Sequence, residues 1–385
     1  MTGRATVPAE PAEAALEHRL KAHAYGLGFD RAGIARLGPA PTADHLGRWL
    51  ERGFAGEMGY MARWQGERGD TRLPFPGARS AIVVTLDYGG RQPSGRIARY
   101  ARGRDYHAVM RQRLRELHRW LEGETGGPIA GRAYVDTGPI LERDLARRAG
   151  LGWFGKNANL ISPRTGSFFF IGALFLDLDL VPDAPFDADR CGSCTRCMDA
   201  CPTGAIPEPR VVDSTRCISY LTIELRGSIP ESLRPGVGEH VVGCDICQDV
   251  CPWNVRFARE PRDPDLTSTD PEPSLSTLLA LTNEEFRRRF GHSAVTRTGR
   301  RGLARNAAVA MGNRGDPSDV PALTRALSSD PEPVVRGHVA WALGRFQTDA
   351  AREALHRAAA TECDPSVRAE IASASEAHES ARTAT

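Results

Sequence analysis

The sequence is poor in lysine, in net charge and in long apolar runs. Its 385 residues include only two lysines, Lys21 and Lys156, and the formal net charge at pH 7 is +2. A net charge so close to zero argues against a generic nucleic-acid binder, so any nucleic-acid contact has to come from a local cluster of charge. No run of 18 or more apolar residues occurs, so we expect no membrane span.

Residues 2–13 are polar and lack the apolar centre of a secretory signal. We therefore expect a cytoplasmic protein whose thiols stay reduced, which argues against disulfides. Arginine greatly outnumbers lysine, and alanine and glycine are abundant, as in proteins from high-GC genomes. Arginine richness alone is therefore weak evidence for phosphate binding.

Cysteine is almost absent outside one window, which holds eight of the nine cysteines. The first run is Cys191-x₂-Cys194-x₂-Cys197-x₃-Cys201-Pro202, and the second set is Cys217 followed by Cys244-x₂-Cys247-x₃-Cys251-Pro252. The first run has the spacing of bacterial ferredoxins, including the proline after the fourth cysteine. Two [4Fe–4S] clusters need eight thiolates, so the pattern predicts two clusters and the transfer of single electrons. Structural zinc would not require a third cysteine in each set or the terminal Cys-Pro.

In two-cluster ferredoxins the fourth cysteine of a run binds the other cluster. This rule assigns the first cluster to Cys191, Cys194, Cys197 and Cys251, and the second to Cys201, Cys217, Cys244 and Cys247. The chain departs from a plain ferredoxin because 26 residues, 218–243, separate Cys217 from Cys244. We expect this insertion to contact a second cofactor or a partner. The ninth cysteine, Cys363, is predicted to be a buried structural thiol.

Helical and strand patterns alternate before the cysteine window, and they predict an α/β domain over residues 13–180, after a disordered tail over residues 1–12. Strands are expected at residues 81–86, 132–136 and 168–178, and helices from residue 16, over residues 105–122 and from Pro139 to about Gly150. A ferredoxin-like domain is assigned to residues 181–258, and a linker rich in proline and aspartate to residues 259–274.

The C-terminal part, residues 275–385, contains an internal repeat. The segment that begins at Leu303 resembles the one that begins at Val335, and the segment at Asp330 recurs more loosely at Cys363, each with an offset of about 32 residues. A period of this size with two helices per unit predicts HEAT-like repeats, which serve either to extend the packing or as a binding surface.

Asp136 is predicted to follow a strand directly and to precede a helix, a place where ligand sites concentrate. Burial beneath an apolar cofactor would raise the pKa of its carboxyl and let it act as a general acid. An ordinary capping or turn role is the alternative.

Several motifs resemble one known family. They are Tyr100-Ala-Arg-Gly-Arg-Asp-Tyr-His107, Val135-Asp-Thr-Gly-Pro-Ile-Leu-Glu-Arg143, Gly152-Trp-Phe-Gly-Lys-Asn157, the eight cysteines, and Cys217-Ile-Ser-Tyr-Leu-Thr-Ile-Glu224. Together they resemble the epoxyqueuosine reductases over roughly residues 14–345. The resemblance implies an enzyme that reduces epoxyqueuosine to queuosine at the wobble position of transfer RNA, the last step of queuosine biosynthesis.

The resemblance also implies cobalamin, in its cob(II)alamin form, reduced through two [4Fe–4S] clusters. Asp136 matches the family's proton donor, and Leu160, Ile171, Ser219 and Asp245 match positions near the corrin. Asp105-Tyr-His107 begins like the cobalamin motif Asp-x-His-x-x-Gly but ends at Met110, so no histidine ligand to cobalt is expected and His107 is interpreted as a pocket or capping residue. An external electron donor is required, and a monomer is expected.

A local cluster of arginines supplies the predicted contact to the tRNA anticodon stem-loop. Its proposed members are Arg297, Arg300, Arg301 and Arg305, close to Arg287-Arg-Arg289 and His292. A base splayed out of the loop could stack on Tyr220, Trp253 or Phe257. Two other functions stay open: a corrinoid reductive dehalogenase-like enzyme acting on a small halogenated substrate, and a ferredoxin-like electron carrier that needs neither cobalamin nor an acid.

Overall fold

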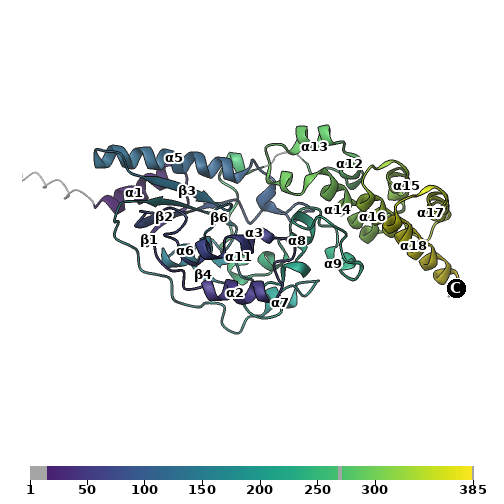
Figure 1. The fold of residues 1–385 in the computed structure, drawn as a ribbon, viewed down its shortest axis with the longest axis horizontal. Coiled ribbons are helices and arrows are strands. Elements are labelled where there is room, and N and C mark those ends of the chain that lie inside the picture. Colours follow the sequence, from purple (N-terminus) through teal and green to yellow (C-terminus); the bar gives the residue numbers. More distant parts are fainter. Residues whose placement is uncertain (1–14, 268–270, 384–385) are drawn as a thin grey trace, which may run out of the picture.

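The computed structural model describes residues 15–267 and 271–383 (Figure 1). The predicted tail over residues 1–12 lies outside these residues, and the predicted linker is described except for residues 268–270. Within the described residues, no helix has the length and apolar character needed to cross a bilayer.

A four-stranded sheet forms the core of the N-terminal part. Its order is β1 (Arg31–Arg36), β2 (Ser80–Asp87), β6 (Phe169–Leu176) and β3 (Gly131–Val135), and every neighbouring pair is antiparallel. The alternation of helices and strands predicted an α/β domain, and the sheet of this domain is antiparallel between neighbours. Strands β2 and β3 run the same way, but β6 lies between them in the opposite direction, so the unit β2–α5–β3 is split.

Helices cover both faces of this sheet (Figure 1). One face packs against α1 (Leu16–Gly26) and α5 (Tyr106–Thr125), and the other packs against α6 (Glu142–Arg148). Strand β2 serves both layers because its side chains alternate: Ile82 and Val84 join the first core, and Val83 joins the second. Its continuous apolar run reflects burial on both faces.

The chain between β3 and α6 differs from the prediction. Strand β3 ends at Val135, Asp136 adopts a left-handed φ of +58°, and α6 begins at Glu142 instead of Pro139. An aspartate tolerates this conformation better than most residues, but it still stores strain. Residues 136–141 therefore form a loop at the sheet edge.

Small elements surround the sheet and the cysteines. They are α2 (Ala43–Glu51), α3 (Gly59–Arg63), α4 (Gln65–Gly69), β4 (Trp153–Phe154), β5 (Leu160–Ile161), α7 (Arg196–Asp199), α8 (Ile218–Ile223), α9 (Arg234–Val237), α10 (Ile246–Asp249) and α11 (Pro252–Phe257). The two cysteine runs correspond to α7 and α10, which lie in contact with each other.

The C-terminal helices form an elongated stack that extends away from the sheet (Figure 1). Its members are α12 (Leu275–Ala280), α13 (Asn283–Phe290), α14 (Gly299–Arg314), α15 (Val320–Ser329), α16 (Pro333–Leu343), α17 (Asp349–Thr361) and α18 (Pro365–Thr383). The repeated segments lie in α14 and α16, which pack side by side, and α18 packs on α16. Cys363 lies just before α18 and is exposed, so the prediction of a buried thiol was wrong.

The insertion between Cys217 and Cys244 packs on this helical stack. Its apolar residues, including Leu221, Ile229 and Val241, share one buried core with α14 and α16. Arg305 of α14 is 1% exposed and donates to the carbonyls of Leu225 (2.8 Å), Gly227 (2.7 Å) and Leu221 (2.5 Å). Asn306 beside it donates to the carbonyls of Thr222 (2.8 Å) and Val241 (2.7 Å). The helical repeats thus hold both ends of the insertion.

We expect Arg305→Met to destabilise the protein by about 3 kcal/mol or more, because three buried carbonyls lose their donor. The midpoint of urea unfolding, followed by helical circular dichroism, should fall. Arg301→Met is the matched control on the same helix: Arg301 is exposed, so the expected change is within about 0.5 kcal/mol. Equal midpoints for the two variants would contradict the anchoring role.

Candidate functional site

The fold brings the eight thiols of the window into two neighbouring sets. The charges of Cys251, Cys191 and Cys194 raise the pKa of Cys197, so these four thiols lie close together. The charges of Cys217 and Cys201 raise the pKa of Cys244 in the same way. Among charged groups, Cys217 and Cys244 raise the pKa of Cys247 most, and Cys197 of the other set comes next. The two sets are therefore adjacent. This grouping agrees with the ferredoxin-type assignment made from the spacing.

A cavity of about 220 Å³ lies at the first set. All four of its thiols, Cys191, Cys194, Cys197 and Cys251, line the cavity together with Lys156, Asn157, Arg190, Arg196 and Trp253. A space enclosed by four soft donors fits an iron–sulfur cluster. The second set is more enclosed, because Cys217 and Cys244 pack against the apolar core of the insertion and the helical stack.

Without metal, these thiols favour their neutral form. Burial raises the pKa of Cys244 to about 12, and it also raises the pKa of Cys217 and Cys247. Bound iron reverses this preference, since a coordinating thiol is deprotonated. Burial thus disfavours free thiolates at the second set.

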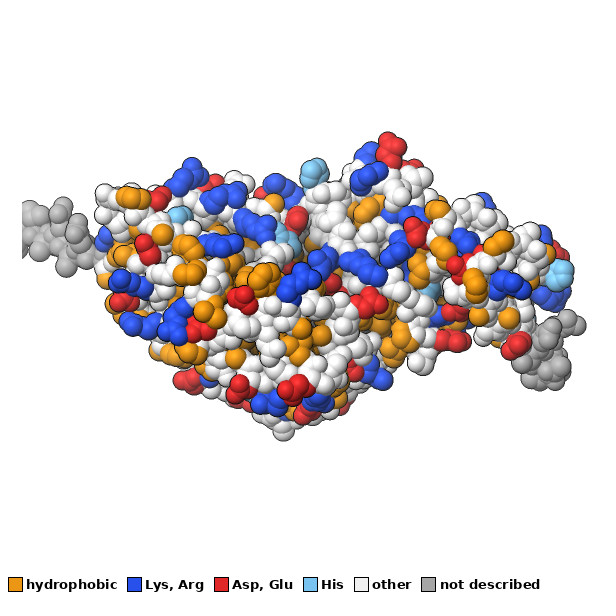
Figure 2. Space-filling model, in the orientation of Figure 1, with side chains coloured by type: hydrophobic (Ala, Val, Ile, Leu, Met, Phe, Trp, Pro, Cys, Tyr) orange, Lys and Arg blue, Asp and Glu red, His pale blue; other side chains and the backbone are white. Residues whose placement is uncertain are grey.

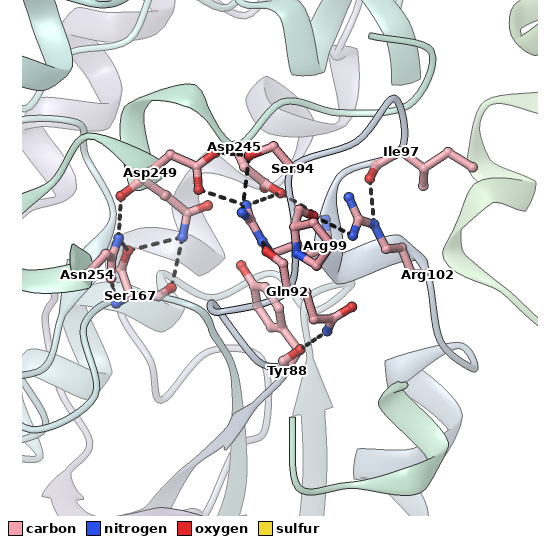
Figure 3. Close-up of polar contacts among 12 residues, drawn as sticks. Tyr88, Gln92, Ser94, Ile97, Arg99, Arg102, Ser167, Asp245, Asp249 and Asn254 are labelled. Carbon is pink, nitrogen blue, oxygen red and sulfur yellow. Dashed lines mark hydrogen bonds and ion pairs between the residues drawn. The ribbon is translucent and has the colours of Figure 1, made fainter. Parts of the chain in front are cut away.

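Arg99 holds the helix of the second cysteine run in place (Figure 3). The guanidinium is 4% exposed, and its Nη1 lies 3.0 Å from Asp245 and 2.8 Å from Asp249, at the two ends of α10. Its Nε donates to the carbonyl of Gln92 (2.7 Å). Cys244 and Cys247 lie on or beside α10, so Arg99 fixes the position of two thiols.

Asp245 is also one of the residues expected near the corrin. Its carboxylate is buried and accepts hydrogen bonds from the backbone N–H of Arg99 (2.9 Å) and from its guanidinium (3.0 Å). Both contacts go to Oδ2, so Arg99 engages one of the two carboxylate oxygens of Asp245. Of the other three, Leu160 is buried, whereas Ile171 and Ser219 are half-buried.

The opposite side of α10 rests on the loop before β6. Gln248 donates to the carbonyl of Ser167 (3.0 Å). Asn254 donates to the Ser167 hydroxyl (2.9 Å), and Figure 3 shows these two residues side by side. The second cysteine run is therefore held between the sheet domain and Arg99. Spacing alone did not reveal these supports, which come from distant segments.

Asp136 projects from the loop after β3, and its side chain is 63% exposed. His107 Nε2 lies 3.3 Å from Asp136 Oδ2, and His107 Nδ1 lies 2.6 Å from Asp105 Oδ1. Asp105 caps the first turn of α5 by accepting from the backbone N–H of His107 (3.0 Å). The three side chains form a chain, Asp105–His107–Asp136, that the sequence analysis missed, although it had named His107 as a pocket or capping residue.

The charges in this chain differ from the expectation for Asp136. Partial desolvation raises its pKa, but the hydrogen bonds of His107 and Tyr106 and the charge of His107 outweigh it, so the pKa lies below its ordinary value. Burial lowers the pKa of His107, but Asp136 and Asp105 outweigh burial and raise it. Of the two side chains, His107 is thus the stronger base, and the expected rise in the pKa of Asp136, which depends on burial beneath a cofactor, stays a prediction.

Two further groups lie close to Asp136. Burial, followed by the charge of Asp136, raises the pKa of Glu142 to about 8, and its Oε1 has no hydrogen-bond partner among the described residues. Desolvation, and then the carboxylates of Glu224 and Asp136, raise the pKa of Tyr60, which Arg297 opposes. Tyr60 lies on α3 and is partly exposed, with the Arg297 guanidinium 5.6 Å from its ring centre.

The four arginines proposed to contact RNA do not form one surface. Arg297 and Arg301 are exposed, and Arg297 pairs with Glu224 (2.8 Å). Arg305 is buried in the anchor of the insertion, where burial lowers its pKa to about 9, and Arg300 is mostly buried in an ion pair with Asp330. The prediction was therefore wrong for Arg300 and Arg305, because helical periodicity places them on the packed side of α14.

Figure 2 shows Lys and Arg side chains gathered where the sheet domain meets the helical stack. Arg297 is exposed and lies near Asp136, so it remains a candidate for RNA contact. Tyr220 is buried, and its hydroxyl accepts from the N–H of Glu57 (2.8 Å), so a base of the RNA cannot stack on it. Trp253 lines the thiol cavity and stacks on Phe257. Tyr60 is the exposed aromatic residue beside Asp136.

Three protein-family models match parts of the chain. Residues 68–137 match the one described as "Epoxyqueuosine reductase QueG, DUF1730", residues 190–254 match "4Fe-4S double cluster binding domain", and residues 293–376 match "HEAT repeats". The chain thus contains a 4Fe–4S cluster-binding domain, followed by HEAT repeats in its C-terminal helical part.

Relatives resemble the chain along most of its length. The epoxyqueuosine reductase of Xanthomonas campestris is 41% identical over 349 residues, which cover 87% of this chain and 97% of the relative. A crystal structure of an epoxyqueuosine reductase with an epoxyqueuosine-modified tRNA-Tyr stem-loop superimposes with a TM-score of 0.85 at 32% identity, covering 94% of this chain and 99% of the other. The Bacillus subtilis epoxyqueuosine reductase, with its catalytic aspartate loop swung out of the active site, gives a TM-score of 0.83 at 32% identity, covering 94% of this chain and 98% of the other.

Arg99→Ala should lower the iron bound per chain and destabilise the protein by about 3–5 kcal/mol, because it leaves the buried Asp245 and the half-buried Asp249 without their cation. Iron analysis after reconstitution and urea unfolding measure the two effects. Arg96→Ala is the matched control: Arg96 pairs with Glu239 on the surface at 3.1 Å, and such pairs contribute about 0–1 kcal/mol. Normal iron loading in Arg99→Ala would refute the role of Arg99 in holding α10.

Proposed function

Since the chain belongs to the epoxyqueuosine reductase family of oxidoreductases in queuosine biosynthesis, we propose that it removes the epoxide oxygen of epoxyqueuosine in the anticodon stem-loop of tRNA. Electrons enter through two [4Fe–4S] clusters, and Asp136 supplies protons at the substrate. The observation that carries this proposal is the Asp105–His107–Asp136 chain, which ends in an exposed carboxyl in a protein that also has two sets of four thiols.

The proposed ligands of the clusters are the two thiol sets described above. Cys191, Cys194, Cys197 and Cys251 hold the first cluster, and Cys201, Cys217, Cys244 and Cys247 hold the second. The four-thiol cavity and the proximity of the two sets support this assignment. Electrons can pass between clusters in such close sets one at a time.

A cobalamin beside Asp136 would supply the low-potential cobalt chemistry that cleaves the carbon–oxygen bond. The unpaired Oε1 of Glu142 and the exposed Asp136 carboxyl fit a polar group bound here. Half-buried Ile171 and Ser219 would contribute side-chain surface to the corrin, and Leu160 and Asp245 would contribute mainly backbone. His107 is engaged on both ring nitrogens by Asp105 and Asp136, so it is not free to ligate cobalt.

The reaction consumes two electrons and two protons. The epoxide loses its oxygen as water, and the two carbons that carried it become an alkene. Asp136 transfers protons to the departing oxygen, and protonated His107 restores the proton that Asp136 gives up. Asp105 holds the His107 ring in position through the 2.6 Å contact at Nδ1. Where Asp136 starts as the carboxylate, it first accepts the proton of His107 and then transfers that proton to the departing alkoxide, which is a strong base.

For the substrate, the proposed contacts are Arg297 with the RNA backbone and Tyr60 with an unstacked base. Both lie beside Asp136. Arg301 extends the exposed positive surface along α14.

The test is conversion of tRNA carrying epoxyqueuosine to tRNA carrying queuosine by the reconstituted holoenzyme with a strong chemical reductant, measured by nucleoside mass spectrometry. Asp136→Asn should keep full iron loading but lose at least about 100-fold in turnover, because general acid catalysis contributes about 10²–10⁴-fold. Near wild-type turnover in this variant would exclude Asp136 as the proton donor. Absence of conversion by the fully loaded wild-type enzyme would refute the proposed reaction.

The His107–Asp136 pair predicts a pH dependence. Because the pKa of His107 is raised, the proton on this ring is fully present below pH about 6.5 and is lost as the pH rises through the higher folded value. Turnover should therefore decline on the alkaline side. In Asp136→Asn the NMR titration midpoint of His107 should fall, since the carboxylate that contributes most to raising this pKa is removed. An unchanged midpoint would show that the two residues are not coupled.

A further inference from the structure

One face of the cysteine region combines an exposed apolar centre with unpaired positive charge. We define this donor face by Lys156, Arg190, Arg196, Val250, Val255 and Arg256. A hollow of about 480 Å³ on it is lined by Arg196, Asp199, Ala200, Val250 and Val255. Arg196 of α7 lines both this hollow and the four-thiol cavity. The donor face therefore lies directly against the thiols proposed to bind the first cluster.

The apolar centre is unusual for this surface. Val255 of α11 is 67% exposed and is one of six large apolar side chains that are exposed among the described residues. An apolar centre with a charged rim is the common anatomy of a protein-binding surface. The small size of the hollow suits a transient contact, as electron-transfer partners make.

The rim carries an excess of positive charge. Arg190, Arg196 and Arg256 are exposed, and none forms an ion pair with any residue that the structure describes. Lys156 adds a fourth cation, and its Nζ donates only to the carbonyl of Gly192 (2.7 Å). Of the carboxylates near this face, Asp199 accepts from Thr195 (2.7 Å), and Asp189 is paired with Arg210. An acidic partner would be attracted and oriented by such a rim.

The two thiol sets also differ in how easily a partner can reach them. Cys217 and Cys244 of the second set pack against the buried core of the insertion and helical stack. The first set lines a cavity whose walls include the exposed Arg190 and Arg196. Electrons from outside therefore have their shortest entry through the first set.

We propose that the donor face is the docking site of a small acidic one-electron carrier protein, which reduces the cluster at Cys191, Cys194, Cys197 and Cys251. This inference rests on the proposed function and adds the class of partner and its place of contact. The RNA contact is assigned elsewhere, beside Asp136, Tyr60 and Arg297.

The test compares two reductants on the reconstituted holoenzyme. Reduced flavodoxin is an acidic one-electron carrier protein and has to dock on the donor face before it can reduce the cluster. Dithionite is a small ion and reaches the cluster without docking. Arg256→Glu and Val255→Glu place negative charge on the donor face without changing a cluster ligand. Arg325→Glu is the matched control, because Arg325 is also exposed but lies on α15 of the helical stack.

We expect the KM for flavodoxin to rise roughly tenfold in the double variant Val255→Glu/Arg256→Glu, with unchanged dithionite-driven turnover and no effect of Arg325→Glu. Higher salt should weaken flavodoxin-driven turnover of the wild type more than that of the double variant. Stopped-flow absorbance of cluster reduction by flavodoxin gives the same comparison without tRNA.

An unchanged KM for flavodoxin would overturn the docking proposal, and so would an equal loss with both reductants, which would place the effect on the cluster itself. A raised KM for tRNA at unchanged KM for flavodoxin would assign the face to RNA and also overturn it. If the wild type fails with dithionite but its clusters are reduced by flavodoxin, the proposed reaction falls and the docking site is still tested by cluster reduction.

Discussion

The structure depends on keeping Cys217 and Cys244 together across the 26 residues that separate them. A free loop of this length would leave two thiols poorly placed, since chain entropy opposes bringing them together. Arg305 and Asn306 bind the backbone carbonyls of the insertion from one side, and Arg99 holds the helix after Cys244 from the other. The helical repeats thus hold in place the segment that joins Cys217 to Cys244.

The same anchoring links the parts of the molecule. Arg99 precedes by a few residues the start of α5, where Asp105 and His107 meet Asp136. A single stretch of chain therefore supports the second thiol set at one end and Asp136 at the other. In the proposed function, electrons and protons have to reach the same substrate, and a short connection between their proposed sources would keep the relative position of those sources constant.

Local sequence predicted much of this. Ferredoxin spacing predicted the two thiol sets, the apolar run at residues 81–86 predicted β2, and the repeat of 32 residues predicted the stacked helices. These patterns are read from neighbouring residues because each reflects a local geometric demand, such as ligand spacing or helical period. The position of Asp136 after β3 was also evident, whereas the helix after it began later than expected because of the left-handed turn at Asp136.

What the sequence by itself determined is the chemistry at its disposal: eight soft ligands, a carboxylate at a strand end, and repeating helices. Only the tertiary structure decided which residues act together. Contacts between segments far apart in the chain set the antiparallel insertion of β6, the burial of Arg300 and Arg305, and the opposite pKa shifts of His107 and Asp136. A charge or a pKa is set by its surroundings in space, and no spacing rule contains those surroundings.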